Sequence, residues 1–225
     1  MEYILIRSKR KTLSIKISKD AELLVKAPLY LSEHIIKDYI NSKKDWILEK
    51  QRMVKRFNDK KSKFSLNYGD KVLFRGKEYT IRCDFKNKIY FQDDSLYLPS
   101  NLKESDVKLF IIKLYKLLAK KHLNERVNHY KNIMRVSPKL VKVNSASTRW
   151  GSCSSKGSLN FSWKIIFAKD EQIDYVVVHE LAHMKELNHS KYFWDEVRFV
   201  LPDYKQRQNQ LRKIEYRLKC ENWDQ

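Results

Sequence analysis

Residues 176–194 read VVVHELAHMKELNHSKYFW and contain three of the chain's six histidines. His179 and His183 are four residues apart, so on an α-helix they lie one turn apart on the same face. Both imidazoles can therefore reach one metal ion. Glu180 follows the first histidine and places a carboxylate beside that ion, and His189 offers a third imidazole.

The order His-Glu-x-x-His on a helix is typical of metal-dependent proteases. Two histidines bind zinc, and the carboxylate of the glutamate acts as general base toward the metal-bound water. The alternative is a chance pattern on a solvated helix. The apolar run IDYVVV that precedes His179 favours a buried helix, where paired histidines need a role.

His189 can complete the site only if the helix ends before it. A continuous helix would carry His189 roughly 240° around the axis from His183. Asn188 tolerates a left-handed conformation at a helix end, and Ser190 can cap a second helix, KYFWDEVRFV. Catalytic zinc generally takes three protein ligands and leaves one position for water. The sequence therefore predicts one Zn²⁺ bound by His179, His183 and His189, with Glu180 as catalytic base.

The composition is that of a folded protein with a positive surface. With 225 residues and 42% hydrophobic content, the chain can bury a substantial core and is not disordered. Its net charge of +20 implies either attraction to polyanions or solvated, lysine-rich helix faces. Three scattered cysteines favour reduced thiols over a disulfide framework. Without an export signal or an apolar run of membrane-spanning length, we expect a cytoplasmic protein with no membrane association.

The order of elements predicts an α+β fold in two parts. Residues 1–66 form an N-terminal β-rich region, with strands up to Pro28 followed by a basic helical segment. A polar stretch near residues 60–68 marks the boundary with residues 67–225. Strands within 69–98 are expected to extend or pack with the N-terminal sheet.

A long helix over residues 104–134 follows, and it carries His122 and His129. Each is either an ordinary packed or exposed histidine or a group that supports the metal ligands. Two strands then lead into the metal helix, KLVKVNSASTRWGSCSS and SLNFSWKIIFA. The segment SLNFSW has the character of a sheet edge that could bind an extended peptide, with an internal strand as the alternative.

Three motifs in the C-terminal half carry a family resemblance: Arg149-Trp150-Gly151-Ser152-Cys153, the His-Glu-x-x-His motif at 179–183, and Asn188-His189-Ser190. With RSKRKTLSIKI and VKAP near the N-terminus, the chain resembles the YgjP-like metal-dependent hydrolases, which are related to SprT-like zinc proteases. The resemblance implies a zincin-type metallopeptidase domain after the β-rich region. It also implies zinc held by His179, His183 and His189, and Glu180 as catalytic base.

Two neighbouring families fit the sequence less well. In the metzincins a glycine precedes the third histidine, but Glu186 stands there, and no methionine follows Met184 to make their Met-turn. In the gluzincins a downstream glutamate is the third ligand, and Glu196 is the nearest candidate. Glu196 therefore remains an alternative to His189.

Peptide-bond hydrolysis of a polypeptide substrate is the predicted activity, with Arg149 or Tyr192 as candidates to stabilise the oxyanion. One alternative is a metal-dependent nucleoside triphosphate hydrolase, although no phosphate-binding glycine loop is present. Another is a protease that processes proteins bound to nucleic acid, as the related SprT-like proteases do. Basic residues dense in 43–63 and 103–142 would suit a phosphate backbone. The sequence indicates neither the natural substrate nor the oligomeric state.

Overall fold

The computed structural model describes residues 1–223, and these residues form a mixed α+β structure with three small sheets and six α-helices. Residues 1–64 with 219–222 make one compact unit, and residues 65–218 with Trp223 make the other. The α+β class is confirmed. The division into functional domains at residue 66 remains a prediction.

The first unit is a three-stranded sheet with two helices. Strands β1 (Ile4–Ser8), β2 (Ser14–Ile17) and β3 (Leu23–Pro28) are ordered β1-β3-β2. Helices α1 (Glu33–Ser42) and α2 (Lys44–Ser62) follow, and the side chain of Ser32 caps α1. Alternate residues of β3 and one face of the helices make the core: Leu23, Val25, Ala27, Ile36, Ile40 and Ile47.

A separate sheet begins the second unit. Within residues 1–223 this sheet pairs only its own four strands, in the order β4-β5-β7-β6: β4 (Lys71–Phe74), β5 (Lys77–Asp84), β6 (Tyr90–Gln92) and β7 (Ser95–Pro99). The expectation that they extend the N-terminal sheet is therefore wrong. Strand pairing is set by non-local register, which alternation within a strand does not reveal.

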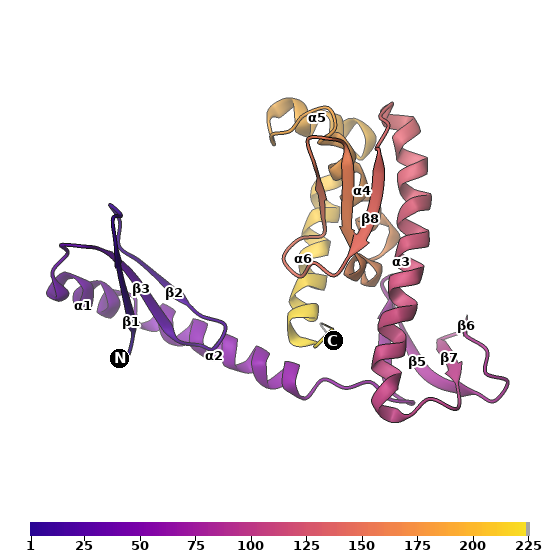
Figure 1. Ribbon diagram of the computed structural model, residues 1–225, viewed down its shortest axis with the longest axis horizontal. Helices are drawn as coiled ribbons and strands as arrows, with labels where there is room; N and C mark the ends of the chain where they lie inside the picture. Colours follow the sequence, from indigo (N-terminus) through magenta and orange to yellow (C-terminus); the bar gives the residue numbers. More distant parts are fainter. Residues whose placement is uncertain (224–225) are drawn as a thin grey trace. The chain divides into compact units, whose positions relative to one another are not determined.

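Helix α3 (Glu104–Met134) occupies the predicted residues. Its buried positions recur at helical spacing, from Val107 and Ile111 to Tyr130 and Met134. It ends at Arg135, which has the left-handed conformation with φ 53°. In Figure 1, α3 runs alongside strand β8 (Leu140–Asn144), and it packs against helix α4 (Asp170–Ala182), which carries His179.

The third sheet consists of β8 (Leu140–Asn144), β9 (Gly151–Cys153) and β10 (Ser158–Ser162), ordered β8-β10-β9. Strand β10, the predicted sheet edge, lies in the middle, so that prediction is wrong. Its neighbours β8 and β9 are the two edges. Backbone hydrogen bonds join Ser162 N to Trp150 O and Ser154 N to Ser158 O. Because bonding alternates along antiparallel strands, the N–H and C=O groups of Gly151 and Cys153 point away from β10.

A short 3-10 helix, η1 (Trp163–Phe167), connects β10 to α4 (Asp170–Ala182), and all five of its residues are buried. Residues 172–178 of α4 are also buried, which agrees with its apolar sequence. Helices α5 (Lys191–Val200) and α6 (Tyr204–Cys220) complete the chain. No helix in the described part of the chain has the length and apolarity that a membrane crossing requires.

Candidate metal centre

The structure brings the three predicted histidines together. His179, His183 and His189 each offer one ring nitrogen, and these atoms all lie within 4.8 Å of one another. The Nε2 atoms of His179 and His189 are 3.1 Å apart. Two nitrogen ligands of a tetrahedral zinc ion, each about 2.0–2.1 Å from the metal, stand about 3.3 Å from each other. The spacing and the donor set therefore fit a single metal ion.

The three histidines can converge because α4 ends before His189, as predicted. His183 is the C-cap of α4, with helical φ and ψ, and the next turn closes through bonds from Lys185 N and Glu186 N to Ala182 O. Asn188 is not among the residues with positive φ, so the break does not use a left-handed asparagine. The hydroxyl of Ser190 then accepts a hydrogen bond from Phe193 N and starts α5.

Hydrogen bonding orients one of the three imidazoles. His183 Nδ1 lies 3.1 Å from the carbonyl oxygen of Glu186. A carbonyl can only accept, so Nδ1 carries the proton and Nε2 keeps its lone pair for a metal. His179 Nδ1 is buried and has no hydrogen-bond partner among residues 1–223.

Aromatic packing from α5 supports all three imidazoles. The ring of Phe193 is fully buried, and its centroid lies 4.5–4.9 Å from the ring centroids of His179, His183 and His189. Trp194 stacks on His189 with centroids 5.7 Å apart. These contacts restrict the imidazole rotamers before any ion binds.

The surroundings disfavour the charged form of His179 and His189. Burial, together with the neighbouring His183 and His189, lowers the pKa of His179 to about 3. Burial and His183 also lower the pKa of His189. Neutral imidazole is the form that binds metal, so the site disfavours the competing proton.

Glu180 directly follows His179 in α4 and is a buried carboxyl group. Its side chain is on α4, and only 5% of the residue is exposed. Burial raises the pKa of Glu180 to about 7, while the positive charge of Arg149 opposes the shift. A carboxyl group with a pKa near neutrality can both accept and return a proton. Its Oε2 atom has no hydrogen-bond partner within the described chain.

The other candidates lie outside the histidine cluster. Glu196 accepts a bond of 2.7 Å from Lys185 Nζ and does not join the three histidines, so the alternative third ligand gains no support. Tyr192 is 72% exposed on α5. His122 Nε2 lies 3.3 Å from Asp170 Oδ1 at the start of α4, and His129 packs edge-on against the ring of Tyr130.

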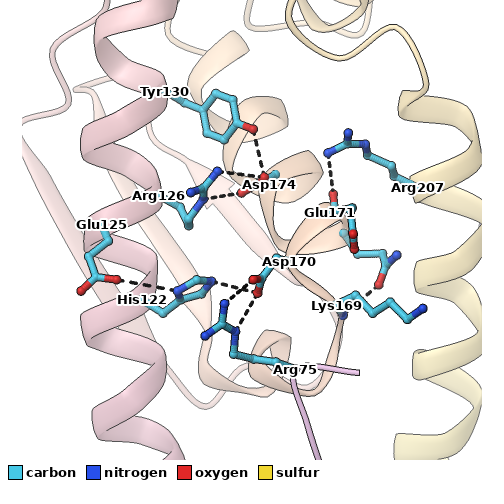
Figure 2. Close-up of polar contacts among 11 residues, drawn as sticks. Arg75, His122, Glu125, Arg126, Tyr130, Lys169, Asp170, Glu171, Asp174 and Arg207 are labelled. Atoms are coloured by element: carbon cyan, nitrogen blue, oxygen red, sulfur yellow. Dashed lines mark hydrogen bonds and ion pairs between the residues drawn. The ribbon is translucent and has the colours of Figure 1, made fainter. Parts of the chain in front are cut away.

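A polar network between α3 and α4 was missed from the sequence (Figure 2). Asp174 of α4 accepts two bonds from Arg126 and one from Tyr130. Asp170 accepts two bonds from Arg75 in the β4–β5 turn. The signal was present, because a single acidic residue inside the buried run IDYVVV requires a partner.

Comparison with known proteins identifies a family. The family described as YgjP-like, metallopeptidase domain, matches residues 11–214. The crystal structure of the metallopeptidase zymogen of Pyrococcus abyssi abylysin is 25% identical and matches with a TM-score of 0.35, covering 44% of this chain and 97% of that one. The zymogen of Methanocaldococcus jannaschii jannalysin is 20% identical, with a TM-score of 0.34 and coverage of 43% and 92%. None of the curated proteins matches the chain.

Proposed function

Because the chain belongs to the YgjP-like metallopeptidase domain family and is thus a metal-dependent hydrolase, we propose that it is a zinc metallopeptidase that hydrolyses peptide bonds. The proposed domain is of the zincin type and spans residues 67–225, after the β-rich region 1–66. One observation carries the proposal: three imidazoles converge on one point, and the residue that follows the first of them, Glu180, has a buried carboxyl group.

The chemistry divides between the ion and the chain. A zinc ion supplies Lewis-acid chemistry, since it polarises a carbonyl and lowers the pKa of a coordinated water. His179, His183 and His189 would hold the ion, and zinc with three protein ligands generally keeps one position open. Glu180 accepts a proton from the attacking water and returns it to the leaving amine. Arg149, whose positive charge lowers the pKa of Glu180, is kept as a candidate to stabilise negative charge on the substrate.

The edge of β9 favours a polypeptide over a nucleotide as substrate. Gly151 and Cys153 turn their main-chain N–H and C=O groups away from β10, and Gly151 lies against Glu180. An extended peptide can add to such an edge through its own main-chain groups. A nucleoside triphosphate has no matching main-chain groups. We therefore prefer peptide hydrolysis over the alternative of nucleotide hydrolysis.

The test is hydrolysis of an unfolded protein and of nucleoside triphosphates by the purified chain, with and without a chelator. We expect cleavage of the unfolded protein that is lost with chelator and restored by zinc. Glu180→Gln is the control that assigns the activity to this site. Triphosphate hydrolysis that depends on Glu180, without peptide cleavage, would select the alternative.

A second proposed role, binding of nucleic acid, is favoured by the exposed face of α2. Arg52, Lys55, Arg56 and Lys60 are exposed and form no ion pair or hydrogen bond within residues 1–223. Trp46 and Met53 are partly exposed on the same helix. Four cations without partners suit a phosphate backbone, and the bases of a nucleic acid provide stacking surfaces for an aromatic ring.

Fluorescence anisotropy with a labelled oligonucleotide tests this role. Binding should weaken steeply with salt, and each phosphate contact contributes about 0.7 to 0.9 to the slope of log K against log salt. Replacing the four cations with glutamine should reduce the slope by up to about 3 or 4. If this variant binds as tightly as the wild type, nucleic acid binds to another surface. If the wild-type chain does not bind at low salt, the positive charge of α2 is only a solvated surface feature.

A further inference from the structure

Gly151 differs from the other three glycines of the chain. Gly69, Gly76 and Gly157 have positive φ, where glycine is favoured because it lacks a Cβ. Gly151 lies in β9 without a positive φ, in a conformation that alanine can adopt. Its backbone conformation therefore does not require glycine, and the reason must lie in its surroundings.

Those surroundings are the side chain of Glu180. A Cβ placed on Gly151 would stand 2.6 Å from Oε1, 2.7 Å from Cγ and 2.8 Å from Cδ of Glu180. Non-bonded carbon atoms prefer separations of about 3.5–4.0 Å. Alanine at position 151 would thus collide with three atoms of one side chain, and either β9 or the carboxyl group would have to move.

Glu180 has little else to fix its place. Its Oε2 atom is buried with no hydrogen-bond partner among the described residues. The helix beneath it cannot move freely, because Val177, Val178 and Leu181 are fully buried. Packing against the β9 backbone is therefore the contact that sets the position of the carboxyl group.

We propose that Gly151 is a positioning residue for Glu180: the absence of a side chain lets β9 close over the carboxyl group and hold it beside His179. The inference deepens the proposed function and rests on it for the role of Glu180. Strand β9 also has the edge that we propose to bind the substrate. The same strand would therefore position both the general base Glu180 and the substrate peptide.

The contact is tested first by protein stability in the absence of metal. We expect Gly151→Ala to lower the urea midpoint of unfolding in the wild-type background. In the Glu180→Ala background the carboxyl group is gone and the methyl group has room, so the same substitution should cause no loss. If Gly151→Ala lowers the urea midpoint equally in the two backgrounds, the glycine is required by β9 itself and not by Glu180, and the proposal is overturned.

The positioning role is tested by kinetics on a protein substrate. Gly151→Ala should retain one zinc per chain but lose about 10²-fold in kcat, as displacement of a catalytic group by about 1 Å commonly does. Full kcat with normal zinc content would overturn the proposal while the proposed function stands. If the wild-type chain lacks peptidase activity that depends on Glu180, the proposed function fails, and the stability comparison still decides whether Gly151 holds the carboxyl group.

Discussion

The guanidinium group of Arg126 on α3 donates two hydrogen bonds to the carboxylate of Asp174 on α4, with lengths of 2.5 and 2.9 Å. Asp174 is 8% exposed and lies five residues before His179. A two-pronged contact between planar groups restricts both sliding and rotation. The pair therefore fixes how the helix with the metal ligands is seated on α3.

Removing one partner of this pair should destabilise the chain. Arg126→Met leaves a buried carboxylate with Tyr130 as its remaining side-chain donor, so we expect a loss of about 2–3 kcal/mol in the free energy of unfolding. Urea denaturation measures it. Adding Asp174→Asn should recover part of the loss, since the uncompensated charge is removed. Arg198→Ala, which breaks the exposed pair with Asp195, is the control and should cost less than about 1 kcal/mol.

Metal content should depend on His189 and not on Glu196. We expect one zinc per chain by elemental analysis, with His189→Ala losing most of it at limiting metal concentration. Glu196→Ala should keep the metal, because the Glu196 carboxylate pairs with Lys185. The opposite pattern would replace His189 with Glu196 as the third ligand.

Metal binding and catalysis should separate at Glu180. Glu180→Gln keeps the shape of the side chain and removes the base, so zinc content should be unchanged. Hydrolysis should fall by roughly 10² to 10⁴, the usual contribution of a general base. Undiminished cleavage of an unfolded protein by the zinc-loaded variant would rule out the mechanism proposed for this site.

Acid should weaken the contact at the start of α4. Hydrogen bonds from Arg75 lower the pKa of Asp170 below its ordinary value of 3.8. A lowered folded-state pKa contributes stability above the unfolded-state value and loses it as the pH falls through the folded-state value. The difference in urea midpoint between wild type and Asp170→Asn should therefore be constant near pH 6 and shrink below about pH 4. A difference independent of pH would show that the carboxylate charge does not contribute.

The local parts of the structure could be predicted because local sequence determines them. Helix α3 has the predicted bounds, since its apolar residues recur at one period over 31 residues. The convergence of His179, His183 and His189 followed from helix geometry and from the serine that caps α5. The roles of these residues and of Glu180 remain predictions that the experiments above test.

The remaining parts depend on contacts between distant segments. Whether SLNFSW was an edge or a central strand depended on its pairing with β8, which no local pattern encodes. Gly151 stands in a serine-rich stretch, and only the approach of Glu180, 29 positions later in the chain, explains the absence of a side chain there. Asp174 and Arg126, 48 residues apart, were missed for the same reason.

The three proposed ligands differ in how firmly the chain holds them. His179 lies in α4, where residues 172–178 are buried, and His183 is the C-cap residue of that helix. His189 is instead exposed, in the stretch between α4 and α5. Packed helices exchange their amide hydrogens only in rare, extensive openings, but exposed connections open locally and often. Release of a bound ion therefore requires only the stretch at 184–190 to swing away. The residence time of the metal should follow amide exchange in that stretch, and substitutions that raise the melting temperature of the whole chain should leave it unchanged.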